Sequence, residues 1–395
     1  MFGDGFLADP YPALAALRQE GPMHRMEMFG GAWTFTRHAD ISALLRDARL
    51  SARRSDALVF QFSAEQQAEL TDFRRLFSQW MLFFDPPEHT RPRRAMSRGF
   101  RPAVIADLVA RITQVVDGLI DTVEGQGSCD AIADLAHPLP AIVIAEMMAI
   151  PAADRQRFMI WSDDVAEFFG RDLATFDIAL KAQTGLRELT DYFREVVARR
   201  RRQPGEDLIS QLLALEAEEA LSEEEVWAQC AMLLFAGHET TRNLIGNGLL
   251  ALLREPAARQ RYLERSDLGR TAIDELLRFD SPVQIGSRLV AEEISLHGET
   301  IAPGELLIFL LGAANRDPDE FAEPDRLDLT RSPNRHVSFG YGPHLCLGSH
   351  LARMEADIVF RRLFTRLPAL RLATEDLVWS TNFGFRGLTA LPLEF

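Results

Sequence analysis

The sequence predicts a mainly α-helical protein with small β-sheets, folded as a single large domain over residues 1–395. Three observations support this fold class. Helical periodicity runs through most of the chain, strand-like runs are few and short, and no repeat, low-complexity tract or Gly/Ser-rich linker marks a domain boundary. Because 47% of the residues are hydrophobic, the chain can bury a large core.

Helical patterns are clearest at 39–50, 102–125 and 178–202. A longer helix is predicted to begin at Ser222 and Glu225, which have capping-box spacing, and to run until Pro256. At 1.5 Å per residue it is about 50 Å long, enough to cross a domain. Its middle, AMLLFAG, is apolar nearly all round, so we expect a buried central helix.

Strand patterns occur in two places. Residues 32–36, AWTFT, form one short run, and residues 293–310 contain extended apolar pieces separated by HGE and PGE. Gly and Pro at these separators are typical of turns, so we expect hairpins there.

Composition limits the class of function and the compartment. Lys and Arg number 43 against 58 Asp and Glu, and a net charge of −15 disfavours binding to nucleic acid. The RRRR run at 199–202 closes a helical pattern, where cations complement the helix dipole.

Three scattered cysteines form no disulfide framework or CxxC zinc motif. Without a signal-peptide pattern or an apolar run of about 20 residues, we expect a cytoplasmic protein with no membrane anchor.

The centre of the long helix breaks a local rule. AGHETTRN, residues 236–243, places Gly and two Thr where a buried helix normally avoids them. One interpretation is a locally opened helix at a functional site; the other is a packing notch against another helix, with Glu239 in a salt bridge. A metal-ligand role for His238 is disfavoured because no HExxH pairing accompanies it, and a helical histidine more often packs or bonds locally.

Two further clusters are weaker signals. Glu275 and Arg278 share one face of a helix that must end before Pro282. His89 and Arg93 also share a helix face, within DPPEHTRPRR, and could neutralise a carboxylate or phosphate. Either cluster could equally be an ordinary solvated surface.

Cys346 lies in the unusual loop FGYGPHLCLG, residues 339–348. Four interpretations compete: a metal or haem ligand, a catalytic nucleophile, half of a disulfide, or a buried structural cysteine. Gly340 and Gly342 let the backbone turn tightly and expose its amides, and Gly348 leaves space where a flat ligand could approach. The helical pattern that follows puts the thiol at a helix N-terminus, which favours a sulfur anion. A nucleophile would need a base, and His344 projects differently.

The loop pattern Phe-Gly-x-Gly-x-His-x-Cys-x-Gly resembles the haem-binding loop of the haem-thiolate monooxygenases, the cytochrome P450 superfamily. The other motifs occur in that family's order, so the resemblance covers nearly the whole chain. It implies the cytochrome P450 fold, with the long central helix crossing over the haem. The matching segments are HTRPRR, AGHETT, the Glu275–Arg278 pair, NRDP at 315–318, PDRLD at 324–328 and the C-terminal FRGLTALPLEF.

By this resemblance, Cys346 is the axial thiolate on the iron of haem b, a ligand that favours O–O cleavage. Phe339 packs beside the sulfur, and Gly340 and Gly348 let the porphyrin lie close. The resemblance assigns the haem propionates to four basic residues, which are His89, Arg93, Arg288 and His344.

The resemblance also assigns roles away from the loop. Glu239 and Thr240 match the acid–alcohol pair that delivers protons to iron-bound oxygen, while Ala236 and Gly237 leave room for O2 at a widened turn. A buried ion network is expected to contain Glu275, Arg278 and Arg326. Two departures affect local geometry alone: Pro92 stands where an aliphatic residue is usual, and Leu327 where Phe is frequent.

The resemblance places a mostly apolar substrate pocket above the haem, which implies a hydrophobic substrate. Gln284 is its candidate orienting contact. The candidate lining residues are Phe83, Phe84, Met232, Leu233, Val283, Gln284, Ile285 and Phe383.

The implied function is that of a bacterial-type monooxygenase that hydroxylates or epoxidises a hydrophobic small molecule, for example in secondary metabolism. The chain has no flavin or iron–sulfur motif, so we expect an external ferredoxin and ferredoxin reductase, docking near Arg91, Arg94 and Arg353 of a monomer. A peroxide-driven oxygenase or a non-oxidative haem isomerase on the same scaffold is the alternative, which Glu239 and Thr240 argue against. A haem gas sensor is a third, although the chain leaves no room for an output module.

Overall fold

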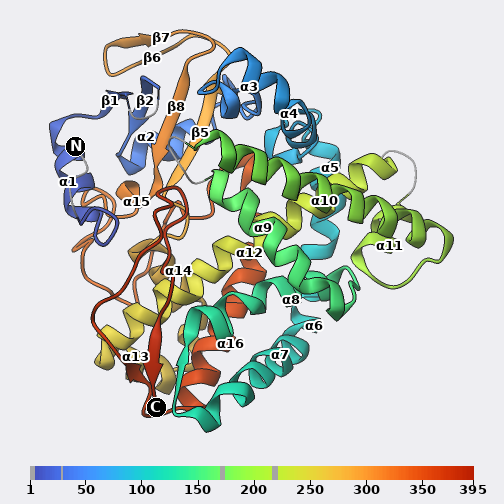
Figure 1. The fold of residues 1–395 in the computed structure, drawn as a ribbon. Coiled ribbons are helices and arrows are strands. Elements are labelled where there is room, and N and C mark those ends of the chain that lie inside the picture. The colour runs from blue at the N-terminus through green and yellow to red at the C-terminus, as the bar shows by residue number, and fades with distance from the viewer. Residues whose placement is uncertain (1–4, 28–29, 170–173, 216–220) are drawn as a thin grey trace.

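The computed structural model describes residues 5–27, 30–169, 174–215 and 221–395. Figure 1 shows a large helical region beside a smaller region of strands at the N-terminal side. The fold class predicted from the sequence, mainly helical with small sheets, is therefore correct. The main hydrophobic core lies among the helices, and two smaller apolar clusters line the largest sheet.

Helix α12, Glu223–Arg254, runs through the middle of the helical region (Figure 1). Ser222 caps it with the predicted capping box to Glu225, and α13 begins directly afterwards at Pro256. Most of its side chains are buried. It contacts four long neighbours, which are α8 (Pro138–Met147), α9 (Arg155–Phe169), α10 (Phe176–Arg202) and α16 (Ser349–Arg366).

The expected widened turn in AGHETT is absent, because α12 is a continuous α-helix through these residues. A π-helical segment lies elsewhere, at Ile132–Ala136, immediately before α8. In α12, the Thr240 hydroxyl donates to the carbonyl of Ala236 at 2.8 Å. The hydroxyl is thus satisfied by a back-bond one turn earlier, without opening the helix.

The other predicted helices form, with some differences in extent. The pattern at 39–50 gives a shorter helix, α2 (His38–Leu44). The pattern at 102–125 gives two helices, α6 (Pro102–Asp107) and α7 (Val109–Val123). The remaining helices are α1 (Tyr11–Glu20), α3 (Ala64–Glu69), α4 (Thr71–Phe77), α5 (Thr90–Ser97), α11 (Leu208–Leu213), α13 (Pro256–Glu264), α14 (Gly269–Phe279) and α15 (Leu311–Ala314).

The largest sheet has the strand order β1-β2-β8-β5-β3. Its pairs are antiparallel except β2 and β8, which are parallel. The parallel pair lies at the centre, so residues far apart in sequence share the sheet's apolar faces. The strands are β1 (Met23–Met26), β2 (Ala32–Phe35), β3 (Leu50–Ser51), β5 (Ile285–Val290) and β8 (Leu306–Leu310).

One of the two expected hairpins forms. Strands β6 (Ile294–Leu296) and β7 (Glu299–Ile301) pair across HGE, where His297 and Gly298 both have positive φ. The PGE turn does not make a second hairpin, because β8 pairs with β2 and β5.

A third sheet has the order β4-β10-β9 and contains β4 (Ser128–Asp130), β10 (Pro392–Glu394) and β9 (Arg371–Leu372). Across the described helices, no segment is both long and apolar enough to cross a membrane.

Candidate functional site

The cysteine loop is held in a tight conformation by its own backbone. Gly340 and Gly342 have φ of 65° and 73°, the left-handed region that favours glycine. A Cβ at Gly342 would lie 2.9 Å from the carbonyl oxygen of Leu45, so a side chain there would also clash. The amide of Cys346 donates to the carbonyl of Phe339 at 2.9 Å, which closes the loop around the thiol.

The surroundings of Cys346 include one influence that raises the pKa of its thiol and others that lower it. Burial raises the pKa of the thiol, while the amide of Gly348 and the charges of Arg93 and Arg353 act in the opposite direction. Arg93 donates to the carbonyl of Leu345 at 2.6 Å, and the Arg353 guanidinium lies 4.5 Å from the Phe339 ring centroid. Burial dominates, so a lasting thiolate at this position requires a further cation, such as a metal ion.

A group of basic side chains lies next to the loop, and we name it the cation group: Arg54, His89, Arg288 and His344. The rings of His89 and His344 are 4.2 Å apart, centroid to centroid. Burial and then the neighbouring arginines lower the pKa of His89 to about 4 and that of His344 to about 3. Burial and then Arg288 lower the pKa of Arg54 to about 9. Burial is the largest cause of each shift and the neighbouring arginines add to it, so His89 and His344 are neutral near pH 7 in the absence of a bound anion.

Within the described ranges, neither Arg54 nor Arg288 nor Arg93 forms an ion pair. The charge of Asp85 acts on Arg54, His89 and Arg288 and partly offsets the lowering of their pKa values. Its carboxylate accepts hydrogen bonds from the Ser51 hydroxyl and the Ala52 amide at 2.5 and 2.7 Å. Gathered positive charge of this kind fits a ligand with carboxylate groups. The sequence motifs identified His89, Arg288 and His344 but missed Arg54, which no motif marks.

The middle of α12 presents an accessible strip on an otherwise buried helix. Ala236 is exposed and Thr240, one turn later, is half-buried, whereas Phe235 and Thr241 are buried. The Glu239 carboxylate accepts hydrogen bonds from Arg242 and Asn243, both at 3.0 Å. The strip therefore combines a hydroxyl next to open space with an acid held at its side.

Gly237, next to this strip, packs closely against α8. A Cβ at this position would lie 3.1 Å from Cγ1 of Ile144 on α8. The missing side chain therefore allows α12 and α8 to approach closely. The contact supports the packing interpretation of Gly237, and the expectation that this turn leaves room for O2 stays a prediction.

The residues present fit an iron macrocycle with two carboxylates. Cys346 offers a soft ligand for iron, Arg54 and Arg288 of the cation group offer positive charge outside any ion pair, and the strip around Ala236 is accessible. Helix α5 connects these parts, because it contacts α12 and its Arg93 bonds to the cysteine loop. His89 is the N-cap residue of α5, and Pro92 lies in the first turn, where proline is tolerated.

Glu275 and Arg278 form the expected buried ion pair, but the third cation differs from the expectation. Arg331 donates to the Glu275 carboxylate at 3.1 Å, and Asn334 adds a bond at 3.0 Å. The Arg326 side chain is 60% exposed and pairs with Glu323 and Asp328. Arg326 contributes only its carbonyl, which accepts from Arg278 at 3.2 Å.

The candidate pocket residues fall into two groups. Four of them, Phe83, Phe84, Met232 and Leu233, belong to the main helical core. The other four lie by the largest sheet: Val283, Gln284, Ile285 and Phe383. Phe383 packs on Phe6, with ring centroids 5.1 Å apart.

The Gln284 side chain is held between protein segments. It is buried, and its amide nitrogen donates to the carbonyl of Ser281 at 2.8 Å. Its amide oxygen packs against Gly312, where a Cβ would lie only 1.9 Å away, and has no hydrogen-bond partner among the described residues. Its role as an orienting contact stays a prediction.

A chain of aromatic rings beside the strip escaped the sequence reasoning. Phe235 lies 5.4 Å from Trp80, 5.2 Å from Phe169 and 6.3 Å from Phe385, measured between ring centroids. Phe83 continues the chain, 6.2 Å from Phe169. The sequence identified only Phe83 as a pocket residue, because Trp80, Phe169 and Phe385 reach Phe235 from distant segments.

Comparisons with known proteins agree with this geometry. The family model described as Cytochrome P450 matches residues 55–371. Cytochrome P450 CYP107DY1 of Priestia megaterium is 40% identical, over 95% of this chain and 93% of that protein. Vitamin D(3) 25-hydroxylase of Pseudonocardia autotrophica is 38% identical, over 100% of this chain and 95% of that protein.

A solved structure has the same fold. The crystal structure of P450BioI in complex with an acyl carrier protein ligated to hexadec-9Z-enoic acid superposes with a TM-score of 0.93. The two chains are 37% identical, and the match covers 99% of this chain and 100% of the other.

Proposed function

This chain belongs to the cytochrome P450 family and is a haem-dependent monooxygenase. From this premise we propose that it inserts one oxygen atom from O2 into a hydrophobic small molecule, by hydroxylation or epoxidation. We further propose that the haem is haem b and that Cys346 is its axial ligand. The observation that carries the proposal is the cation group, whose buried arginines form no ion pair among the described residues, beside a buried cysteine loop.

The cysteine loop supplies the ligand and its environment. A thiolate-ligated haem supplies O2 activation and O–O cleavage. The Gly348 amide and the charges of Arg93 and Arg353 stabilise the sulfur anion. His89, Arg93, Arg288 and His344, with Arg54 added by its position, would neutralise the propionates through charge-assisted hydrogen bonds.

The accessible strip of α12 supplies protons. Thr240 holds its hydroxyl next to open space, anchored on the Ala236 carbonyl. Glu239 is an acid one residue away, and its carboxylate is oriented by Arg242 and Asn243. We propose that Glu239 moves protons inward and that the Thr240 hydroxyl positions them, as a general acid system does.

Aromatic and aliphatic side chains support an apolar substrate. Phe83 packs against the aromatic wall formed by Phe169 and Phe235, and Met232 and Leu233 are buried in the same helical core. Desolvation of an apolar ligand against such a wall provides binding energy without polar contacts. Two of the similar proteins are named for vitamin D3 and for a fatty acyl chain, which are both largely apolar.

We propose that electrons come from an external ferredoxin and its reductase. Of the three arginines expected at the docking site, Arg353 is mostly buried and donates to Asp274 at 2.6 Å. Arg91 bonds to Glu225 at 3.0 Å, and Arg94 is exposed on the same helix, α5. An acidic carrier is therefore expected to contact α5 more than Arg353.

The decisive experiment follows labelled oxygen. The holoenzyme is screened by spin-state titration with terpenoids, macrolides, steroids, fatty acids and aromatic acids, and the best ligand is turned over under 18O2 with ferredoxin, reductase and NADPH. One 18O atom in the product supports the proposal. Turnover with peroxide alone favours the peroxide-driven alternative, an isomerised product without 18O favours the isomerase, and gas binding without turnover of any ligand favours the sensor.

The ligand assignment has its own test. The reduced, carbon monoxide-bound holoenzyme is expected to show the strongly red-shifted absorption band of a thiolate ligand. Replacing Cys346 by serine should abolish that band, whereas Cys129→Ser, at a half-buried cysteine in β4, should retain it. Loss of the band in the Cys129 variant alone would overturn the assignment.

A further inference from the structure

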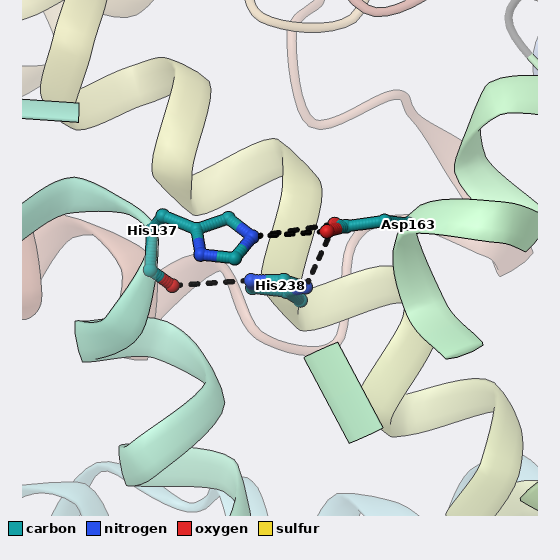
Figure 2. A group of neighbouring side chains, drawn as sticks. All are labelled: His137, Asp163 and His238. Atoms are coloured by element: carbon teal, nitrogen blue, oxygen red, sulfur yellow. Dashed lines mark hydrogen bonds and ion pairs between the residues drawn. The ribbon is translucent and has the colours of Figure 1, made fainter. Parts of the chain in front are cut away.

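Three helices bring two histidines and an aspartate together away from the cysteine loop (Figure 2). His137 precedes α8, Asp163 lies in α9, and His238 lies in α12. His137 Nε2 is 3.1 Å from one carboxylate oxygen of Asp163, and His238 Nδ1 is 3.7 Å from the other. One ligand atom of each residue lies within 4.8 Å of both others.

The hydrogen bonding of His238 leaves a lone pair directed at the carboxylate. Its Nε2 lies 3.1 Å from the carbonyl oxygen of His137, and because a carbonyl only accepts, Nε2 carries the proton. Nδ1 is then an acceptor in the neutral ring. It is buried, with the side chain 1% exposed, and it has no hydrogen-bond partner. Two acceptors, Nδ1 and the Asp163 carboxylate, therefore face one another and require something positive between them.

The position of His137 depends on an unusual backbone segment. The π-helical segment Ile132–Ala136 ends immediately before it, and the His137 amide donates to the carbonyl of Ile132 at 2.8 Å. Widened turns of this kind occur frequently at functional sites. Here the turn presents the ring of His137 to Asp163 and its carbonyl to His238 (Figure 2).

We propose that His137 Nε2, His238 Nδ1 and the Asp163 carboxylate bind one divalent transition metal ion of the zinc type, with solvent as the fourth ligand. Two imidazoles and one carboxylate are a ligand set that Zn²⁺ accepts in tetrahedral geometry. The carbonyl that accepts from the other nitrogen of His238 is the outer-shell contact that metal-binding histidines usually make. The two separations from Asp163, 3.1 and 3.7 Å, are near the ligand–ligand distance of about 3.4 Å expected for bonds of about 2.1 Å.

The ion can reach this position from solvent. The Asp163 and His137 side chains are 41% and 24% exposed, whereas His238 closes the inner side. A bound ion would connect α9, which carries Phe169 of the aromatic wall, to α12. The site uses two imidazoles and a carboxylate, and none of the groups assigned to haem.

The test measures metal content in the holoenzyme, where haem iron serves as an internal standard. After equilibration with ZnCl2 and removal of loosely bound ions, the natural protein should contain one zinc per iron. His137→Gln and Asp163→Asn should weaken zinc affinity by more than the roughly 10–100-fold that loss of an outer-shell partner costs. His297→Gln is the matched control, because His297 pairs with Asp40 at 3.0 Å without a third ligand.

X-ray absorption at the zinc edge tests the ligands without any substitution. The expected signal contains nitrogen and oxygen neighbours and the scattering pattern of two imidazoles. A sulfur neighbour would show that zinc binds at a cysteine and would overturn the proposal. Equal zinc-to-iron ratios in the natural protein and in folded Asp163→Asn protein would overturn it as well.

Discussion

Arg278 and Glu275 form a bidentate ion pair in which neither side chain has any solvent exposure. The Nε–Oε2 and Nη2–Oε1 distances are 2.7 and 2.9 Å. Arg278 also donates to the carbonyls of Asn315 and Pro324, at 2.9 and 2.8 Å. The pair therefore fastens α14 to the long segment that leads into the cysteine loop.

Removing the charge of Glu275 should destabilise the protein strongly. In Glu275→Gln, Arg278 and Arg331 would remain buried without a counter-charge, and breaking a buried pair in this way costs about 3–5 kcal/mol. We expect a lower urea midpoint and a lower Tm, measured by far-ultraviolet circular dichroism. Arg326→Gln is the control and should change stability by less than about 1 kcal/mol, because its ion pairs are exposed. Equal losses in both variants would contradict the network described above.

Arg288→Gln should stabilise the haem-free protein against unfolding but weaken haem binding in the haem-bound protein. Without haem, the substitution removes one of several crowded cations, so unfolding should require slightly more free energy, about 1 kcal/mol. With haem, it removes a charge-assisted hydrogen bond of about 1.5–3 kcal/mol. Haem transfer to an acceptor protein should then become roughly 10–100-fold faster. Arg49→Gln, at an exposed arginine near the same sheet, should leave both measurements unchanged. A change of the same sign in both forms would argue against propionate binding.

Stability should depend on pH through Glu355 in α16. Burial raises the pKa of this carboxyl from 4.5 to about 8, and one of its oxygens has no hydrogen-bond partner. The folded state therefore holds a proton that the unfolded state releases above pH 4.5, so stability falls as pH rises from about 4.5 to about 8. The full effect is on the order of 5 kcal/mol.

The variant Glu355→Gln isolates this effect. Its Tm should match that of the natural protein near pH 5 and exceed it near pH 8, because glutamine carries no charge to bury. The measurement is a series of melting curves between these pH values. A difference in Tm that stays constant with pH would show that Glu355 is not the group that titrates.

Thr240→Ala should separate oxygen consumption from product formation. The hydroxyl that we propose to position protons is lost, so NADPH and O2 are consumed with less product, and product per NADPH should fall about 10-fold or more. Thr240→Ser keeps a hydroxyl that can bond to the Ala236 carbonyl and should restore most of the coupling. If the alanine and serine variants form equal amounts of product per NADPH, the Thr240 hydroxyl does not position protons.

Local patterns in the sequence determined much of this protein. The capping box of Ser222 and Glu225, the stop at Pro256 and the apolar middle predicted α12 nearly to the residue, because these signals act within one or two helical turns. The cysteine loop motif identified the family for the same reason, since its glycines and histidine serve one short segment.

Contacts between distant segments were decided only by the tertiary structure. Spacing places Glu275 and Arg278 on one face, but it cannot say that Arg331 completes the network while Arg326 faces solvent. The position of Ile144 likewise decided that Gly237 is a packing contact.

The same limit applies to His238. From the sequence it lacked a metal-binding partner, because motifs register only ligands at short spacing. The fold brought His137 and Asp163 to it from two other helices (Figure 2). The sequence thus determined which groups each helix presents, and the packing of helices decided which groups meet, because ion pairing and metal binding depend on distance in space.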